Sequence, residues 1–550
     1  MRTGVAIDLG TSGFRAQKID LDTGEIRRTA VTIRNPLPGA NIMDHMDFAM
    51  TYGLDKAHGL VINTVRRLLE ALGIGPEGPE RIAVCGNPIQ LSVFQGIPID
   101  DLAYAGKKKK EKYHITDRKR ESKIIPASEI AGLEIYPDCQ VVIPPAIKHE
   151  IGADALALIV NAGLPDTDEI MIATDFGTNA EMALKAGGVI YTGSAAAGPA
   201  LEGQEISCGA LAGPHTISDV VLEGPYIRCY ILNSEMKPET GDLVDPVTGI
   251  SVEKGNLRAR GITGTGVISL IEQGIAGGLI TLPKINTPDH VIHLQDGITF
   301  IEKDVKEAGN AIGALRAGHM TLCAAAGISP GDIKVSHMSG AAGTYMDAAK
   351  AYRIGMNPYN VDLITQIGNT SLKTAREILL SEDRLRELQD IASKIVGTHV
   401  MFATSDVFKK IYILELSYWG EGMSFKMFRK FLKKKSLPET EEPTKTPVID
   451  RRVERDIPVF GDEGYQMIRR TGTYLAMKVE DPRCAEWIKE CPTHAMSWKD
   501  NMIRIRSDLC DGSNCRKCRR TIPPDIFSWD RLTVMDFRPE ETEASDQEQE

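Results

Sequence analysis

Residues 8–13 read Asp8-Leu9-Gly10-Thr11-Ser12-Gly13 and close the first apolar strand of the chain. The strand that follows, Phe14 to Ile19, completes a predicted hairpin. A second stretch, Asp175-Phe176-Gly177-Thr178-Asn179, repeats the order of aspartate, apolar residue, glycine, threonine and polar residue between two further apolar strands. The repeat predicts two similar α/β lobes, each of which contains the same hairpin.

Both hairpin turns have the composition of a phosphate-binding loop. Glycine lets the backbone approach a phosphate closely, the hydroxyl group adds a hydrogen-bond donor, and the leading aspartate can hold Mg²⁺ through waters. We therefore predict that Asp8 and Asp175 are catalytic residues that position the magnesium ion of bound ATP. The predicted phosphate contacts are Gly10, Thr11, Ser12, Gly177, Thr178 and Asn179.

Three further features complete the predicted nucleotide site. The glycine-rich element Met338 to Gly343 follows an apolar-leaning strand and suits close backbone contact with an adenosine. Another such element, Gly261 to Gly266, is either part of the site or a packing turn between the lobes. Glu150 or Asp154 is predicted to orient the attacking water, and Glu150 is our first choice for this catalytic role. The predicted adenosine contacts are Ser339, Gly340, Ala341 and Gly343.

The order of these elements indicates a fold class. Two Asp-Gly-Thr hairpins followed by Ser-Gly-Ala-Ala-Gly are the arrangement of the acetate and sugar kinase, Hsp70 and actin superfamily. No Gly-x-x-x-x-Gly-Lys-[Ser/Thr] loop occurs, and the Gly-x-Gly-x-x-Gly match at Gly73 to Gly78 ends a helical pattern instead of following a strand. The predicted fold is α/β, a two-lobed actin/Hsp70-like (ribonuclease H-like) ATPase with a small α+β ferredoxin-like domain at its C-terminus.

The composition is that of a soluble globular protein. The chain has 550 residues, 42% of them hydrophobic and 25% charged, and a net charge of -11. Its length predicts about two to four domains, and its acidity argues against nucleic-acid binding. No apolar run approaches the ~20 residues that cross a membrane, and no secretion signal precedes the first strand, so we expect a cytoplasmic protein. The basic stretch Gly106 to Lys123 is either a solvated loop or a docking surface for an acidic protein.

The predicted domain boundaries follow changes in composition. Proline, glutamate, threonine and lysine dominate Ser436 to Thr446, which is typical of a linker. Acidic residues without aromatic residues after Phe537 predict a disordered tail. The predicted domains are a first ATPase lobe at 1–165, a second lobe with the adenosine element at 166–430, a linker at 431–470, a ferredoxin-like domain at 471–537 and the tail at 538–550.

Five of the ten cysteines crowd between Cys484 and Cys518, which suits metal ligation better than a disulfide framework. Their frame is that of a two-cluster bacterial ferredoxin, in which three cysteines of one run share a cluster with the fourth cysteine of the other run. One ligand set is complete and consists of Cys491, Cys510, Cys515 and Cys518. The other set has lost three of four ligands and reads Asp481, Cys484, Trp487 and Ile522.

This pattern predicts one [4Fe–4S] cluster on the complete set, with Cys484 as a remaining thiol. Structural Zn²⁺ on the same four cysteines is one alternative, because Cys-x-x-Cys also suits tetrahedral zinc. A [2Fe–2S] centre is another, although its plant-type pattern needs a later cysteine and none follows Cys518.

Several longer blocks carry a family resemblance. They are Ala6 to Arg15, Ala83-Val84-Cys85-Gly86-Asn87-Pro88-Ile89-Gln90, Pro144-Pro145-Ala146-Ile147-Lys148-His149-Glu150-Ile151-Gly152-Ala153-Asp154, and Ser194 to Ala200. On these blocks the chain resembles, over nearly its whole length, the methylamine methyltransferase corrinoid protein reductive activases of methanogenic archaea.

The resemblance implies an ATP-dependent redox repair that supports methyltransferase activity in methylotrophic methanogenesis. Inactive Co(II) in a corrinoid methyl-carrier protein would be reduced to Co(I), with an iron–sulfur cluster passing on an electron from a low-potential donor. The relatives look like two-cluster proteins, so an electron relay between clusters is not carried over. The chain lacks an Asp-x-His-x-x-Gly cobalamin-ligand motif, so the corrinoid is expected on another protein. A homodimer is left open.

Two other functions fit the motifs. One is a non-redox regulator or scaffold in which ATP switches the shape of the protein and the cysteines bind zinc. The other is a small-molecule kinase, because a nucleotide fold alone does not decide function. The kinase would leave the C-terminal cysteines without a role.

Overall fold

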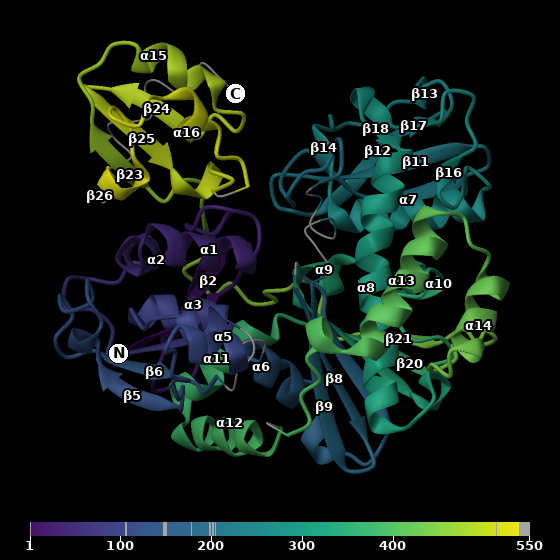
Figure 1. Ribbon diagram of the computed structural model, residues 1–550, viewed down its shortest axis with the longest axis horizontal. Helices are drawn as coiled ribbons and strands as arrows, with labels where there is room; N and C mark the ends of the chain where they lie inside the picture. The colour runs from purple at the N-terminus through teal and green to yellow at the C-terminus, as the bar shows by residue number, and fades with distance from the viewer. Residues whose placement is uncertain are drawn as a thin grey trace. The chain divides into compact units, whose positions relative to one another are not determined.

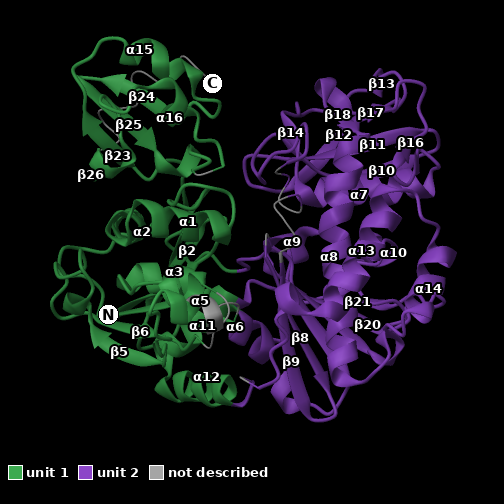
Figure 2. Ribbon diagram, in the orientation of Figure 1, with its two compact units in different colours: residues 1–154, 371–393, 459–550 green, residues 155–370, 394–458 purple. Residues whose placement is uncertain are grey.

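The computed structural model describes residues 2–104, 107–146, 151–177, 179–196, 200, 203, 205–395, 397–512 and 514–537 (Figure 1). Helices and strands are interspersed along the chain, as the α/β prediction requires. The chain divides into two compact units (Figure 2). Unit 1 comprises residues 1–154, 371–393 and 459–550, and unit 2 comprises residues 155–370 and 394–458.

A seven-stranded sheet with the order β22-β3-β2-β1-β4-β6-β5 organises unit 1. Strands β1 to β3 form an antiparallel meander, and β4 and β6 extend the sheet in parallel from β1. The bounds are β1 Thr3–Leu9, β2 Phe14–Asp20, β3 Ile26–Thr32, β4 Arg81–Gly86, β5 Lys123–Pro126 and β6 Gln140–Ile143. The helices of this lobe include α1 (Ile42–Tyr52), α2 (Leu54–Ala71) and α3 (Pro88–Gln95).

A six-stranded sheet in unit 2 repeats this topology, with the order β21-β20-β19-β7-β8-β9. Its antiparallel meander is followed by two parallel strands on the side of β7, just as β4 and β6 follow β1. The bounds are β7 Met171–Asp175, β8 Asn179–Ala186, β9 Val189–Ala196, β19 Val335–Ser339 and β20 Leu363–Gly368. The prediction of two similar lobes is therefore confirmed.

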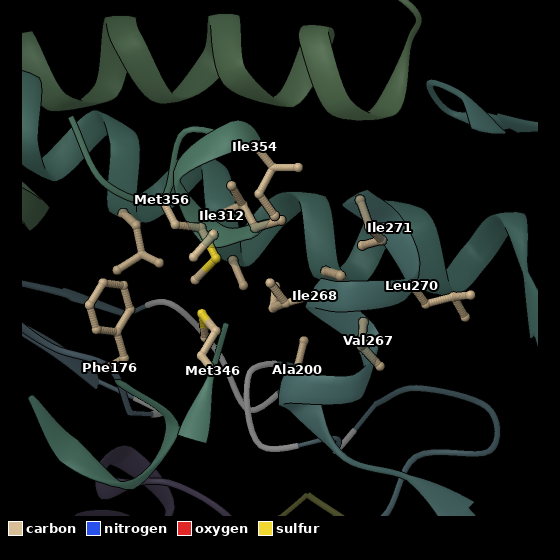
Figure 3. Packing of buried hydrophobic residues seen from close by; sticks show 14 of the residues in the cluster. Phe176, Ala200, Val267, Ile268, Leu270, Ile271, Ile312, Met346, Ile354 and Met356 are labelled. Carbon is tan, nitrogen blue, oxygen red and sulfur yellow. The ribbon is translucent and has the colours of Figure 1, made fainter. Parts of the chain in front are cut away.

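Unit 2 also contains a five-stranded sheet that was not predicted from the sequence, with the order β13-β12-β11-β10-β14. Its strands are β10 Thr216–Glu223, β11 Tyr226–Leu232, β12 Pro238–Val244, β13 Ser251–Glu253 and β14 Gly261–Ile262. Helix α7 (Gly264–Ala276) and helix α8 (Glu302–Ala326) contribute to the same apolar core. Figure 3 shows that Phe176 of the second hairpin and Ile268 of α7 belong to this core.

The segment predicted as a linker, residues 431–470, contains two edge strands. Strand β21 (Val448–Arg451) pairs in parallel with β20 of unit 2, and strand β22 (Tyr465–Ile468) pairs in parallel with β3 of unit 1. Composition could not reveal them, because an edge strand needs backbone hydrogen bonds on one side only and is often short. The segment therefore adds one strand to each lobe sheet.

Helices α11 (Thr370–Leu380) and α12 (Glu382–Ile395) fall in the range predicted for the second lobe, but residues 371–393 belong to unit 1. Arg81 forms an ion pair with Glu382 at 3.3 Å, and the Ser122 N–H donates to Gln389 Oε1 at 2.7 Å. The lobes are thus not contiguous in sequence. No change in composition marks the points where the chain passes from unit 2 to unit 1 and back.

The C-terminal domain has the order β23, α15, β24, β25, α16, β26, which is the βαββαβ pattern of a ferredoxin-like domain. Its sheet is antiparallel, with β23 in the interior beside β25 and β26. The bounds are β23 Thr473–Lys478, α15 Cys484–Trp487, β24 Met496–Lys499, β25 Met502–Arg506, α16 Lys517–Thr521 and β26 Thr533–Asp536. This confirms the predicted α+β class. The predicted tail, residues 538–550, lies outside the described residues.

A buried ion pair joins α8 to α13 (Asp406–Gly420) in unit 2. Arg316 Nε lies 2.9 Å from Glu415 Oε1, and the two side chains are 5% and 0% exposed. The guanidinium is also enclosed by four aromatic rings, whose centroids lie between 5.5 and 5.8 Å away. Those rings are Tyr359, Tyr418, Phe425 and Phe428. Because both charges are removed from water, each depends on the other for compensation.

We predict that Glu415→Ala lowers the free energy of unfolding by about 3–5 kcal/mol, because it leaves the Arg316 charge buried and unpaired. Urea unfolding measures the change. The double variant Arg316→Met with Glu415→Leu should regain most of the loss. The control is Asp362→Ala, which removes a half-exposed pair with Lys445 and should cost at most about 1 kcal/mol. Equal losses in Glu415→Ala and Asp362→Ala would contradict the assignment.

Candidate functional site

The first predicted phosphate hairpin lies between β1 and β2. Asp8 is 5% exposed and pairs in register with Arg15, and Leu9 pairs with Phe14. A Cβ atom on Gly10 would come within 2.6 Å of the Gly13 carbonyl oxygen, so only glycine fits the turn. The hairpin therefore presents the backbone of residues 10–13 at the end of a buried strand.

Two asparagines that were not predicted hold this hairpin. Asn35 Nδ2 donates to the Gly10 carbonyl oxygen at 2.9 Å, and Asn87 Nδ2 donates to Thr11 Oγ1 at 3.2 Å. Asn87 is also the N-cap of α3, where its Oδ1 accepts from the Gln90 N–H at 2.9 Å. The Asn-Pro pair at 87–88 was a usable signal for a helix start, whereas nothing near Asn35 indicated its contact.

Of the two candidates for orienting water, only Asp154 can be placed, because Glu150 lies outside the described residues. A Cβ atom on Gly152 would come within 2.6 Å of Asp154 Oδ1 and 2.7 Å of the Asn87 Cα. Burial raises the pKa of the Cys85 thiol, and the nearby carboxylates of Asp8 and Asp154 raise it further. Asp154 therefore lies in the same part of unit 1 as the first hairpin.

The second hairpin and the predicted adenosine element lie side by side in unit 2. Strands β7 and β19 are parallel, with Asp175 opposite Ser339. Ser339 Oγ donates to Asp175 Oδ2 at 3.1 Å, and the Phe176 N–H donates to the Ser339 carbonyl oxygen at 3.0 Å. Asn179 begins β8, and Thr178 lies outside the described residues. The structure thus brings two predicted parts of the nucleotide site together.

Gly340 and Gly343 allow this close approach. Gly340 has a φ of +80°, and a Cβ atom there would collide with the Asp175 carboxylate. A Cβ atom on Gly343 would lie 3.1 Å from the Phe176 ring. Ala341 stands between them in the short helix α9 (Gly340–Tyr345).

The other glycine-rich element, Gly261 to Gly266, has a packing role in unit 2. Thr263 caps α7 by accepting from the Gly266 N–H at 3.2 Å. A Cβ atom on Gly266 would lie 2.5 Å from the Ile217 carbonyl oxygen, and one on Gly261 would lie 2.8 Å from the Ala210 Cβ. Of the two alternatives for this element, the packing turn is the better supported, and it is a turn within one unit.

The predicted ligand cysteines lie on two loops of the C-terminal domain and, for Cys518, in the first turn of α16. Cys491 follows the 3-10 turn Ile488–Glu490, Cys510 follows the turn Ser507–Leu509, and Cys515 and Cys518 flank the start of α16. Burial raises the pKa of the Cys510 thiol to about 12, the Gly512 N–H lowers it, and Cys518 and Cys491 raise it. Cys515 and Cys491 likewise raise the pKa of Cys518, which is raised mainly by burial. The four thiols are therefore electrostatic neighbours.

This donor set fits a thiolate-bound metal or cluster in chemistry, because a bound cation would offset the mutual repulsion of the thiolates. The side chains are not closed around a common centre. Among the described residues, no group of three or more cysteine, histidine, aspartate or glutamate side chains converges closely enough to hold a metal ion.

The four side chains of the second, incomplete ligand set make ordinary packing contacts or belong to an ion pair. Cys484 is 0% exposed and Ile522 is 2% exposed. Asp481 pairs with Arg483 at 2.6 Å, and the Arg483 guanidinium lies 5.0 Å from the centroid of the Trp487 ring. These four positions have structural partners that do not require a second cluster.

The C-terminal domain contacts α2 through β23 and β26, and α1 through Tyr52. Trp529 stacks on Tyr52 with ring centroids 4.6 Å apart. Asn514 Nδ2 donates to Asp44 Oδ1 at 2.8 Å, and Arg67 pairs with Asp536 at 2.7 Å. The cysteine loops are therefore held beside the lobe that carries the first hairpin.

Part of the basic stretch Gly106 to Lys123 is neutralised within unit 1. Arg120 is 8% exposed and pairs with Asp101 at 2.8 Å, and Arg118 reaches the same carboxylate at 3.1 Å. Burial opposes ionisation of Asp101, but the two arginines lower its pKa to about 2. These arginines are structural, whereas Lys119 is 89% exposed on its side chain. Throughout the described ranges, every helix is too short or too polar to cross a bilayer.

Comparisons with known proteins agree with this organisation. Residues 169–429 match the family described as the C-terminal domain of RACo, the ASKHA domain, and residues 3–167 match the RACo middle region. The Co(II) methylated amine-specific corrinoid protein reductase of Methanosarcina barkeri is 47% identical over 495 residues, which cover 90% of this chain and 91% of the relative.

Two more distant matches extend the comparison. The corrinoid activation enzyme RamQ of Eubacterium limosum is 24% identical over 76% of this chain and 71% of the relative. A solved structure, the reductive activator for corrinoid, iron-sulfur protein, is 25% identical, with a TM-score of 0.61. That match covers 76% of this chain and 66% of the solved chain. The predicted actin-like fold class is confirmed by the ASKHA match.

We predict that Gly340→Ala lowers the affinity for ATP at least about tenfold, because the added methyl group collides with the Asp175 carboxylate. Isothermal titration calorimetry measures the affinity. Gly278→Ala is the matched control, since Gly278 has a φ of +72° but an added Cβ atom would meet nothing within 4 Å. Both variants carry about 1 kcal/mol of left-handed backbone strain, and only the first should change binding. Unchanged affinity in Gly340→Ala would contradict a nucleotide role for this element.

Proposed function

Because the chain belongs to the RACo family, we propose that it reductively activates a corrinoid protein, returning inactive Co(II) to Co(I). The observation that carries the proposal is the 47% identity, over nine-tenths of both chains, with the methylated amine-specific corrinoid protein reductase. The substrate class is accordingly a corrinoid methyl-carrier protein that serves a methylated-amine methyltransferase.

We propose that ATP and Mg²⁺ bind at the two hairpins and that ATP hydrolysis accompanies the reduction. Asp8 and Asp175 would hold the metal, with phosphate contacts from residues 10–12 and 177–179 and an adenosine contact at residues 339–343. Mg²⁺ supplies charge neutralisation on the phosphates when bound. The contacts of Asn35 and Asn87 support this proposal, because they fix the first hairpin in one conformation. Asp154, which lies in the same part of unit 1 as Asp8, and Glu150, which lies outside the described residues, both remain candidates for orienting water.

We propose that Cys491, Cys510, Cys515 and Cys518 hold a single [4Fe–4S] cluster. When bound, the cluster supplies one-electron transfer at low potential. Two features of the chain itself support one cluster: α16, which contains Cys518, packs against the turn that precedes Cys491, and Cys484 and Ile522 of the second set are buried by other side chains. None of the ten cysteines forms a disulfide in the described structure, which suits a reducing compartment such as the cytoplasm.

Anaerobic protein that contains iron and sulfide, mixed with ATP, a strong reductant and Co(II) corrinoid protein, should produce the Co(I) absorption spectrum.

Cys510→Ala and Cys491→Ala should lose at least about 90% of bound iron and of activity, because each removes a ligand. Cys484→Ala, which removes a buried thiol outside the set, should keep both. Zinc without iron in wild-type protein would favour the non-redox regulator, and equal iron loss in all three variants would contradict the ligand assignment.

Four cations surround two of the ligand cysteines and support docking of an acidic electron donor. Arg516, Lys517, Arg519 and Arg520 are exposed and alternate with Cys515 and Cys518, whereas Asp511 is the one acidic residue from Cys510 to Arg520. Lys517 pairs with the exposed Glu490 at 3.3 Å, and Arg519 lies over the Tyr52 ring. Such a concentration of positive charge on a chain of net charge -11 would steer an acidic redox protein to the cluster.

We therefore expect Lys517→Glu with Arg520→Glu to slow cluster reduction by an acidic ferredoxin about tenfold at low salt, with the difference shrinking at high salt. Stopped-flow absorbance measures the rate. Reduction by a small-molecule reductant, which needs no protein docking, should change far less. The matched control is Lys433→Glu with Lys434→Glu, the same charge change on exposed residues of α14 (Phe425–Lys434) in unit 2. Equal slowing in both double variants would contradict this docking surface.

A further inference from the structure

One short segment of unit 1 contacts both the first hairpin and a predicted cluster ligand. We call residues 35–45 the bridging segment, which runs from the end of the first sheet's meander into α1. At one end Asn35 Nδ2 donates to the Gly10 carbonyl oxygen at 2.9 Å, while Asn35 Oδ1 accepts from the Leu37 N–H at 2.9 Å. Asn35 therefore fixes the start of the segment to the hairpin turn.

The other end of the bridging segment contacts the cysteine loop. The Gly39 N–H donates to the Cys510 carbonyl oxygen at 2.8 Å. A Cβ atom on Gly512 would lie 3.3 Å from the Pro38 Cβ, so Gly512 packs directly on Pro38. The Gly512 N–H in turn lies 3.4 Å from Cys510 Sγ, to which it donates. Gly39 thus contacts the backbone of Cys510. Pro38 contacts Gly512, whose N–H donates to the Cys510 sulfur.

Asp44 holds this end of the segment in one conformation. It is 8% exposed, its Oδ2 accepts from the Ala40 N–H at 2.9 Å, and its Oδ1 accepts from Asn514 Nδ2 at 2.8 Å. Gly39 has a φ of +101°, and a Cβ atom there would collide with the Asp44 side chain. Close contacts with Asp44 therefore restrict the backbone conformation of the turn at Gly39.

A second connection runs through α3 and His45. Asn87 links Thr11 of the hairpin to the Gln90 backbone, and Gln90 Nε2 lies 2.9 Å from His45 Nδ1. Burial lowers the pKa of His45 to about 4, so the ring is neutral, and the Gly39 carbonyl favours its protonation. No acceptor among the described atoms meets hydrogen-bond geometry at His45 Nε2, so the Gly39 carbonyl is a neighbour and not a full partner. His45 follows Asp44, whose Oδ2 accepts from the Ala40 N–H next to Gly39, so both connections end in the bridging segment.

We propose that Asn35, Gln90 and His45 are positioning residues that transmit the state of the first hairpin to Cys510 through Gly39. Nucleotide bound at residues 8–13 would shift Pro38 and Gly39, and with them the Gly512 N–H that donates to the Cys510 sulfur. Hydrogen bonds to the ligand sulfurs help set the potential of an iron–sulfur cluster. This inference rests on the proposed function, because it requires both a nucleotide and a cluster.

The alternative is that these contacts only dock the C-terminal domain on the lobe. The domain has a separate set of contacts that could do this, namely the stacking of Trp529 on Tyr52 and the ion pair between Arg67 and Asp536. Neither touches Cys510 or the hairpin in the described contacts. A variant of this second set therefore separates docking from transmission.

The first test measures the midpoint potential of the reconstituted cluster with and without a saturating non-hydrolysable ATP analogue. In the wild type we expect nucleotide to change the reduction equilibrium about tenfold, which is about 59 mV for one electron. Asn35→Ala and Gln90→Leu should each lose part of the shift, and the double variant should lose nearly all of it. Asp536→Ala, which removes only the Arg67 ion pair, should keep the full shift.

The second test needs no cluster. Hydrogen–deuterium exchange of the peptide covering residues 507–516 is measured in cluster-free protein, with and without the same analogue. Wild type and Asp536→Ala should change their exchange on nucleotide binding, and the Asn35→Ala with Gln90→Leu variant should not. Calorimetry confirms that each variant still binds the analogue at the concentration used.

The outcomes separate this inference from the function on which it rests. Wild-type protein that binds nucleotide and assembles a cluster, yet shows no shift in either measurement, would overturn the inference alone. So would a double variant that keeps the wild-type shift. Failure of the wild type to bind nucleotide or to assemble a cluster would overturn the proposed function, and the inference with it.

Discussion

Trp529 stacks on Tyr52 at a centroid distance of 4.6 Å, and Phe48 meets the same indole edge-on at 6.3 Å. Trp529 is 3% exposed, so this aromatic contact belongs to a dry core shared by α1 and the C-terminal domain. The polar contacts around it, from Asp44 to Asn514 and from Gly39 to Cys510, depend on this packing to bring their partners within reach. This packing therefore holds the cysteine loops against one lobe, in addition to the chain connection.

The sequence predicted those parts of the fold that are local in the chain. Each hairpin is encoded in one continuous stretch, residues 3–20 and 171–186, because the aspartate, the turn glycine and the flanking apolar strands are contiguous. The ferredoxin-like domain was equally readable from cysteine spacing. In contrast, the contacts of Asn35 with Gly10 and of Asn514 with Asp44 join residues 25 and 470 positions apart, and no spacing rule indicates them. Strands β21 and β22 were missed because an edge strand carries little periodic signal.

The four positions of the predicted incomplete ligand set take part in the packing and ion pairs of the C-terminal domain. A cluster ligand must reach the metal, whereas Cys484 and Ile522 are almost fully buried among protein atoms. Asp481 is satisfied by Arg483, which also covers the Trp487 ring. Each position of the set therefore has its own stabilising partner, and restoring single cysteines there would disturb this packing before it created a site.

The segment from 448 to 478 joins three sheets in chain order, since β21 extends the unit 2 sheet, β22 extends the unit 1 sheet and β23 lies inside the sheet of the C-terminal domain. Residues 469–472 are a short connection between β22 and β23, and within it the Thr471 carbonyl accepts from Arg67 of α2 at 3.2 Å. The C-terminal domain is thus anchored to its lobe both through the chain and through side chains. A cluster of the proposed kind, held by a domain anchored in this way, would stay beside this lobe, and its electron donor would dock at the cysteine loops, where the exposed cations of residues 516–520 lie.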